Sequence, residues 1–193
     1  MKRRALKTDV YTKAAEQFSR LSKDSSGVGA IIISASGEPL AFGYNGPPPC
    51  FDDDKLPKGK TPELRKIKCS TVGDLEFDSI FSESSKYDYA IHAERNAIRY
   101  ATRSRSVDLE GSHIFVTRFP CKSCALEIAA SGISHVHCDL PISSEEEEGL
   151  TLFYCLHPDN KGGLTAAPIN SSLEILLEAG VTIWLRNQKI EAA

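Results

Sequence analysis

Two short motifs in the sequence carry residue types that bind metals and transfer protons. The stretch "IHAERNAIRY" places His92 and Glu94 two positions apart at the start of an apolar, helix-like run. The stretch "TRFPCKSC" places Cys121 and Cys124 three positions apart, a spacing that brings both sulfurs onto one face of a helix. Two thiolates and one neutral imidazole form a ligand set for Zn²⁺ that leaves the fourth position to water, as in a catalytic zinc site.

Glu94 fits the role of a proton carrier beside such an ion. As a carboxylate it takes a proton from the bound water, and as an acid it gives one to the substrate, so it should not be a ligand. Side chains at positions i and i+2 in mid-helix point about 200° apart. The assignment therefore requires His92 and Glu94 to lie in the first, end-exposed turn of a helix.

The start of the second predicted helix favours metal binding. Pro120 is tolerated there because its missing N–H would have no partner within the helix. The backbone amides and the helix dipole at this end favour thiolates, the form of cysteine that binds metal. A zinc ion with two thiolates is formally neutral, which weakens it as a Lewis acid, but helix ends aimed at it partly compensate, and its water can still reach a pKa of roughly 7.

Each motif has a simpler interpretation when it is taken alone. A histidine two positions before a glutamate occurs by chance, and a CxxC pair can be redox-active or form half of a structural zinc site. A core histidine with two buried thiols is the remaining alternative. The two motifs together, each at a predicted helix start, favour the catalytic zinc.

The periodicity of apolar residues predicts the elements that position these motifs. Residues 28–44 are expected to form an antiparallel hairpin, and the later alternation of strands and helices indicates parallel strands connected through helices. The other predicted elements are helices at about 5–22, 91–103, 121–131 and 171–180, and strands at 113–119, 134–140 and 181–187. About five strands and four helices fit an α/β fold in which one mixed sheet has helices on both faces.

The chain of 193 residues has the size of one domain, and we expect a single domain over residues 1–193. Residues 45–88 lack clear periodicity. Insertions are expected at about 68–86 and at 141–168, and the acidic run "SSEEEEG" in the second is expected to be a solvated loop.

Composition excludes several classes of protein. The net charge of −3 provides no broad attraction to nucleic acid. No apolar run approaches the length that crosses a membrane. The first residues, "MKRRALKTDVYTKAAEQF", lack the apolar core and cleavage site of a secretory signal, so we expect a cytoplasmic location. Six cysteines in that reducing compartment are expected to be thiols or metal ligands.

The arrangement His-Ala-Glu followed by Pro-Cys-Lys-Ser-Cys resembles the zinc-dependent cytidine deaminase superfamily. With "GYNGPPPCFDDDKLP" it looks like the deoxycytidylate (dCMP) deaminase family, over roughly residues 5–140 and 171–187. The resemblance implies a three-layer α/β/α fold and hydrolysis of dCMP to dUMP and ammonia. It also implies a homo-oligomer, often a hexamer, activated by dCTP with Mg²⁺ and inhibited by dTTP.

The resemblance also implies roles for individual residues. By position, the zinc ligands are His92, Cys121 and Cys124, and the general acid/base is Glu94. Among the substrate-binding residues, Asn45 is expected near the sugar, although the "NG" pair is also a common turn. Ala93 and Phe119 are expected to line the base pocket, although Phe119 can equally be a core residue.

Several assignments stay open at this stage. The first insertion is either a lid over the active site or an inert surface loop. The cations considered for the phosphate are Lys55, Lys58, Lys60, Arg65, Lys86 and Arg118. The remaining cysteines and histidines could form a second zinc site, but core thiols and surface imidazoles are the favoured interpretation, because their spacings match no compact ligand motif. These residues are Cys50, Cys69, Cys138, Cys155, His113, His135, His137 and His157.

Two alternatives to a dCMP deaminase remain. The first is a deaminase of another nucleotide or base, such as CMP, a modified dCMP or guanine, or of nucleic acid, since the superfamily shares both motifs. The acidic charge argues against nucleic acid, and "GYNG" favours nucleotides. The second is a catalytically silent, nucleotide-binding or structural zinc protein. Glu94 argues against it, because a structural zinc needs no uncoordinated acid.

Overall fold

The structure is a computed structural model of the whole chain. It describes residues 7–190 apart from 25, 53–54, 60, 68–70, 73–74, 77–79, 106, 141, 148–149, 159–162 and 186–187. The chain divides into two compact units, one of residues 1–45 and 92–193 and the other of residues 46–91.

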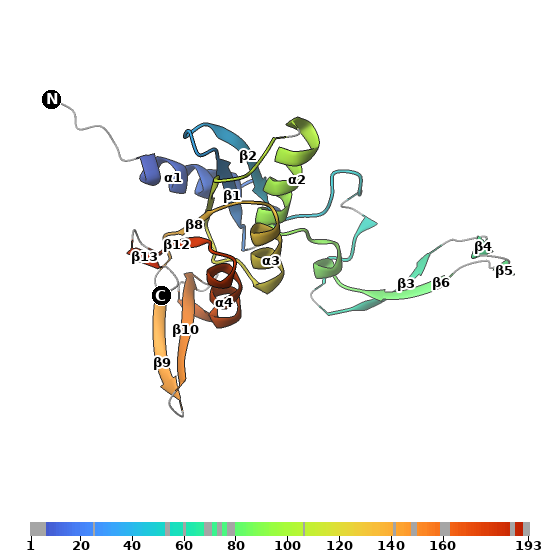
Figure 1. Cartoon of the computed structure of the whole chain (residues 1–193). Coiled ribbons are helices and arrows are strands. Elements are labelled where there is room, and N and C mark those ends of the chain that lie inside the picture. The colour runs from blue at the N-terminus through green and yellow to red at the C-terminus, as the bar shows by residue number, and fades with distance from the viewer. Residues whose placement is uncertain are drawn as a thin grey trace. The chain divides into compact units, whose positions relative to one another are not determined.

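The larger unit is built on one six-stranded mixed sheet (Figure 1). In spatial order its strands are β13 (Gln188–Ile190), β12 (Thr182–Leu185), β8 (His135–Cys138), β7 (His113–Val116), β1 (Gly29–Ile33) and β2 (Pro39–Tyr44). Strands β7, β8 and β12 are parallel, whereas β1 pairs antiparallel with both β2 and β7. The predicted hairpin and parallel strands are confirmed, and β13 extends the predicted sheet of about five strands to six.

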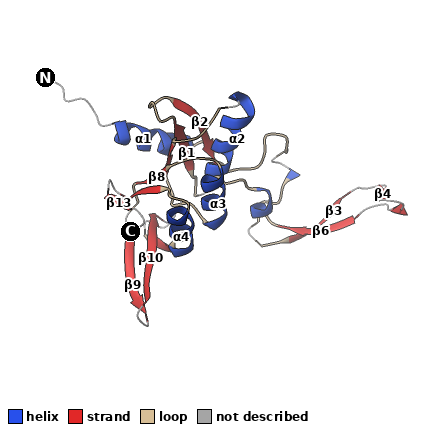
Figure 2. Ribbon diagram, viewed as in Figure 1, coloured by secondary structure: helices blue, strands red, loops and turns tan. Residues whose placement is uncertain are grey.

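Helices cover both faces of this sheet. Successive side chains of a strand point to opposite faces, so apolar side chains on either face need a layer that covers them. One face packs against α2 (Ala93–Arg105), α3 (Lys122–Ala130) and α4 (Asn170–Glu178). The other face, which includes Ile31 and Phe115, packs against α1 (Lys7–Ser19). The predicted three-layer α/β/α fold is therefore confirmed (Figure 2).

A close backbone approach fixes α2 against the edge of the sheet. Gly43 in β2 lies so near α2 that a Cβ atom there would overlap the carbonyl oxygen of Ala93 and the amide nitrogen of Ala97. The Asn96 side chain donates a hydrogen bond of 2.8 Å to the carbonyl oxygen of Tyr44. The start of α2 therefore has a defined position relative to β2.

The smaller unit, residues 46–91, is closed by backbone hydrogen bonds between Gly46 and Ile91. It contains the antiparallel pairs β3 (Glu63–Ile67) with β6 (Ile80–Ser84) and β4 (Thr71–Val72) with β5 (Leu75–Glu76), followed by η2 (Lys86–Tyr89). These segments pair as strands although the sequence here lacks clear periodicity, because backbone hydrogen bonds between strands need no apolar period.

A capping box starts η2. The Ser85 side chain accepts a hydrogen bond from the Tyr87 amide, and the Asp88 carboxylate accepts one from the Ser85 amide. The hydrogen bond from the Ser85 backbone is the main reason that the pKa of Asp88 is lowered.

The second predicted insertion is a small antiparallel sheet rather than a loop. Its strands are β9 (Ile142–Glu147), β10 (Leu150–Pro158) and β11 (Leu164–Pro168). The acidic run was expected to be a solvated loop. Glu145 and Glu146 are exposed, but they belong to β9, because its backbone pairs with β10. The single-domain organisation and the role of the first insertion stay predictions.

None of the helices in the described part of the chain is long and apolar enough to cross a membrane.

We expect Gly43→Ala to destabilise the protein by about 1–3 kcal/mol, because the added methyl group meets the backbone of α2, which cannot yield without moving the helix. Urea unfolding measures the change. Gly46→Ala is the matched control, since no atom lies within 4 Å of its added Cβ, and it should change stability by less than about 0.5 kcal/mol. Equal effects at the two positions would contradict the close approach.

Candidate active site

The two motifs lie at the first turns of two neighbouring helices. His92 directly precedes α2, and its carbonyl oxygen accepts a hydrogen bond from the Asn96 amide at 3.0 Å. Cys121 is the N-cap of α3, and Cys124 lies buried in the first turn of the same helix. The geometry required for His92 and Glu94 is therefore present, because His92 stands at the helix end rather than in mid-helix.

The three predicted ligand atoms converge. The Nδ1 atom of His92 lies 3.4 Å from the Sγ atoms of both Cys121 and Cys124. All three ligand atoms lie within 4.8 Å of one another. Tetrahedral zinc, with bonds of about 2.0 Å to nitrogen and 2.3 Å to sulfur, would hold nitrogen and sulfur about 3.5 Å apart. The His/Cys/Cys arrangement is thus consistent with Zn²⁺, and no other group of this kind occurs among the residues that the structure describes.

Protons compete for these same atoms when no ion neutralises the thiolates. The pKa of Cys121 falls to about 2 because its sulfur accepts hydrogen bonds from Cys124 and His92. The pKa of Cys124 is raised, first by its hydrogen bond to Cys121 and then by burial. The hydrogen bond to Cys121 also raises the pKa of His92. Metal binding requires deprotonated ligands and therefore releases protons here.

Glu94 is close to the ligands but is not part of the ligand group. Its side chain is almost fully buried, with 3% exposure, and this burial raises its pKa. A backbone hydrogen bond and the charge of His92 lower the pKa, but less than burial raises it. The carboxyl group is therefore easier to protonate than an exposed glutamate, which suits a group that must alternate between base and acid.

An ion pair that the sequence did not suggest links the two helices. The Nε atom of Arg95 in α2 lies 2.5 Å from Oε2 of Glu127 in α3, with side-chain exposures of 37% and 28%. At this exposure the pair contributes little to stability. Its main effect is on the positions of the helices, because the ion pair joins the two helices whose first turns carry the ligands. No local sequence signal connects two residues so far apart in the chain.

Asn45 is buried and has both ends of its amide occupied. Its Oδ1 atom accepts a hydrogen bond from the Val28 amide at 2.6 Å, and its Nδ2 atom donates one to the Asp24 carboxylate at 3.0 Å. This network joins the end of β2 to the chain before β1. The predicted contact of Asn45 with a sugar stays a proposal.

The two residues expected at the base pocket lie in the hydrophobic core. Ala93 is fully buried and Phe119 is 6% exposed, and both pack in the cluster between the sheet and α2, α3 and α4. The structure therefore agrees with the core alternative for Phe119. Contact of either residue with a base stays a prediction.

The cations considered for a phosphate are dispersed along the chain. Lys55 forms an ion pair with Asp52 at 3.0 Å, and the ammonium group of Lys86 lies 5.1 Å from the centre of the Tyr87 ring. Lys60 and the side chain of Arg65 lie outside the described residues. A phosphate contact by Lys55, Lys58, Lys86 or Arg118 stays a prediction.

The residues considered for a second zinc site separate into different places. Cys138 and Cys155 share a hydrogen bond in the core, and that bond and burial raise the pKa of Cys138. Cys50 is exposed in the smaller unit. Cys69 and the side chain of His157 lie outside the described residues, and the other histidines of the set are on the α1 face of the sheet. The described members thus do not all converge on one centre.

Comparison with known proteins agrees with the fold and the site. The family described as "Cytidine and deoxycytidylate deaminase zinc-binding region" matches residues 5–140, which contain both motifs. These observations define the class of the protein: a zinc-dependent deaminase fold with a His/Cys/Cys site. The chain belongs to the cytidine and deoxycytidylate deaminase family.

Its relatives within that family include named deoxycytidylate deaminases. The chain is 34% identical to the Mus musculus protein over 138 residues, which cover 67% of this chain and 66% of that protein. It is 34% identical to the Enterobacteria phage T4 protein over 154 residues, covering 69% of this chain and 78% of that protein. The chain thus spans slightly less than two thirds of the length of the mouse relative.

A solved structure extends the likeness to nearly the whole chain. The dCMP deaminase of cyanophage S-TIM5, in complex with dCMP and dUMP, superposes with a TM-score of 0.56 at 25% identity. The superposition covers 92% of this chain and 94% of that chain.

We expect Cys121→Ser to lower the zinc content of the purified protein and its resistance to thermal unfolding, because the ligands connect two helix starts through the ion. Elemental analysis and a thermal melt measure the two effects. Cys50→Ser is the matched control, since Cys50 is an exposed thiol outside the ligand group. Full zinc content in Cys121→Ser would contradict the assignment.

Proposed function

We propose that this chain is a zinc-dependent deaminase that hydrolyses dCMP to dUMP and ammonia. The observation that carries the proposal is the convergence of His92, Cys121 and Cys124 beside a buried acid that is not a ligand. The named relatives and the superposition on a dCMP-bound enzyme support the choice of substrate. In this reaction the C4–N bond of cytosine breaks, a C4–O bond forms, and one water is consumed.

The residues divide the chemistry between them. His92, Cys121 and Cys124 would hold the ion, which when bound lowers the pKa of water and so supplies hydroxide near neutral pH. Glu94 takes the proton released from the water and delivers it to N3 of the pyrimidine. It then takes a second proton from the hydroxyl group newly bound to C4 and gives it to the departing amine, so that the C4 carbonyl forms and ammonia leaves.

Burial prepares Glu94 for this proton transfer. A carboxyl group with an ordinary pKa would remain ionised near neutral pH and would be a poor donor to N3. Because burial raises the pKa of Glu94, the protonated form becomes accessible once the group has accepted a proton. Its position in the first turn of α2, two residues after His92, holds it beside the ligands.

The other substrate contacts belong to the same proposal. Asn45 is the candidate for the sugar, and Ala93 and Phe119 are the candidates for the base. Regulation by dCTP with Mg²⁺ and by dTTP and assembly as a hexamer stay predictions from the family resemblance, and a cytoplasmic location stays a prediction from the sequence.

Glu94→Gln should retain zinc while deamination falls by about two to four orders of magnitude, because the amide cannot accept and donate the proton. Ultraviolet absorbance follows the conversion, and elemental analysis of the same sample reports the metal. Glu178→Gln, in the exposed last turn of α4, is the control and should keep the parental rate. Undiminished turnover in Glu94→Gln would remove Glu94 from its role.

We expect dCMP to have the highest kcat/KM in a panel of dCMP, CMP, deoxycytidine, dCTP and guanine. The reason is that the mouse and phage T4 relatives are named deoxycytidylate deaminases. Steady-state assays with and without dCTP, Mg²⁺ and dTTP also report any regulation. Conversion of only a free nucleoside or only a triphosphate contradicts the proposed substrate. Zinc-loaded protein that converts none of the five supports a silent zinc protein instead.

A further inference from the structure

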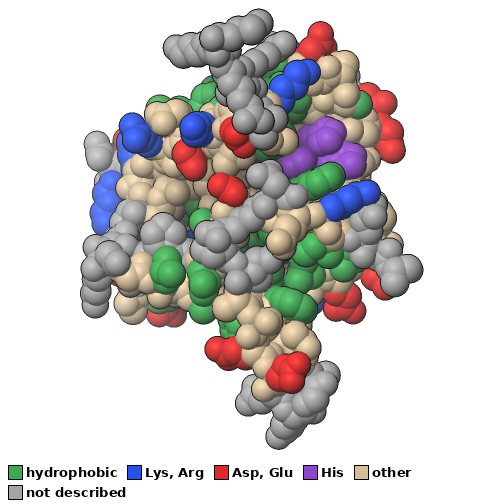
Figure 3. All heavy atoms as spheres, turned by 90° about the vertical axis from the view of Figure 1, so that its left-hand side faces the viewer, with side chains coloured by type: hydrophobic (Ala, Val, Ile, Leu, Met, Phe, Trp, Pro, Cys, Tyr) green, Lys and Arg blue, Asp and Glu red, His purple; other side chains and the backbone are tan. Residues whose placement is uncertain are grey.

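Three histidines lie together on the α1 face of the sheet, away from the proposed active site. His113 in β7 and His135 and His137 in β8 point to this face because alternate residues of a strand share a face. In the parallel register, His113 lies opposite His135, and Phe115 lies opposite His137. Figure 3 shows a group of histidine side chains at the surface on this side of the larger unit.

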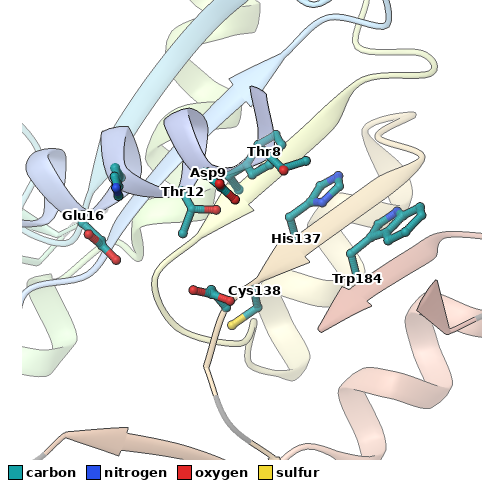
Figure 4. Close-up of a pocket in the computed structure, with 10 residues that line it drawn as sticks. Thr8, Asp9, Thr12, Glu16, His137, Cys138 and Trp184 are labelled. Atoms are coloured by element: carbon teal, nitrogen blue, oxygen red, sulfur yellow. The ribbon is translucent and has the colours of Figure 1, made fainter. Parts of the chain in front are cut away.

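Helix α1 leaves part of this face accessible. It packs over Ile31, Ile33 and Phe115, which belong to β1 and β7. A cavity of about 370 Å³ remains beside it, and His113, His137 and Trp184 are among the lining residues. Figure 4 shows His137 and Trp184 extending from neighbouring strands beside α1. The imidazoles of His113 and His137 are therefore open to a small solute.

The distance between these two imidazoles fits a shared metal ion. The Nδ1 atom of His113 lies 3.0 Å from the Nε2 atom of His137. Two metal–nitrogen bonds of about 2.0 Å, enclosing an angle of about 90–110°, would place the nitrogens about 2.8–3.3 Å apart. Without an ion, a hydrogen bond can join the two nitrogens, with one N–H proton between them. Hydrogen bonds join the ligand atoms around His92 in the same way.

We propose that His113 and His137 form a second metal site, which binds a late divalent transition metal ion such as Ni²⁺, Cu²⁺ or Zn²⁺. The two imidazoles supply neighbouring ligands, and water from the cavity fills the other positions. Nitrogen ligands select these ions over Mg²⁺ and Ca²⁺, which prefer oxygen.

The protonation states of the pair favour binding. Burial first, and then the charges of His113 and His135, lower the pKa of His137 to about 3. Burial and the charge of His135 likewise lower the pKa of His113. Both rings are therefore neutral near pH 7, and a metal ion does not have to displace a proton from an imidazolium group.

His135 packs against the pair but is not assigned as a ligand. Its ring stacks on that of His113, with centroids 4.1 Å apart and planes inclined by 13°, whereas its centroid lies 6.5 Å from that of His137. In such face-to-face stacking the in-plane lone pairs of the two rings run side by side, whereas the rings of His113 and His137, with centroids 5.2 Å apart and planes inclined by 25°, bring two nitrogens within 3.0 Å of each other. His135 is thus a matched control of the same residue type on the same face.

Equilibrium dialysis of the zinc-loaded protein against Ni²⁺, with both metals measured in each sample, tests the site. We expect the parent protein to take up one Ni²⁺ per chain while it keeps its zinc. His113→Gln and His137→Gln should each weaken Ni²⁺ binding by about tenfold or more, since loss of even an outer hydrogen-bond partner can cost a metal site that much. His135→Gln should bind Ni²⁺ as the parent does.

A thermal melt gives an independent readout, because an ion that binds only the folded protein raises Tm. Ni²⁺ should raise Tm of the parent and of His135→Gln but not of the other two variants. Retained zinc and deaminase activity show that the variants are folded. The proposal is overturned if the parent takes up no Ni²⁺, if Ni²⁺ only replaces zinc, if His113→Gln and His137→Gln bind it normally, or if His135→Gln loses it.

Discussion

The site depends on two helices beginning next to each other on one face of the sheet. His92 stands at the start of α2 and Cys121 at the start of α3, so residues far apart in the chain reach one point. Metal–ligand distances tolerate deviations of only about 0.2 Å. The backbone contact of Gly43 with α2 and the ion pair between Arg95 and Glu127 can be understood as restraints on the positions of these helix starts.

The same helix starts also set the electrostatics of the site. Backbone amides at a helix N-terminus favour thiolates, and burial beside the ligands raises the pKa of Glu94. Thiolates weaken the ion as a Lewis acid. A carboxyl group that accepts a proton from water and returns it to the substrate compensates for part of this loss. The proposed hydrolysis thus relies on a neutral metal centre combined with a buried acid/base.

The sheet separates this chemistry from a second polar surface. On the active-site face, small residues such as Ala93, Ala97 and Ala125 allow the helices to approach closely. On the other face, α1 leaves room for imidazole and indole rings beside a cavity. A metal ion bound by His113 and His137 would connect β7 to β8 without changing the ligands of the active-site ion.

Residue types and local periodicity sufficed to predict the hairpin and the three layers, and they singled out the candidate ligands that the structure brings together, because strong motifs and apolar periods are local properties of the chain. The pairings β3–β6 and β9–β10 escaped prediction, since pairing through backbone hydrogen bonds leaves no signal of its own in the local side-chain pattern. The partners of Asn45, the Arg95–Glu127 ion pair and the approach of His113 to His137 depend on contacts between distant segments. Such contacts exist only once the sheet register brings those segments together, and therefore the folded structure was needed to find them.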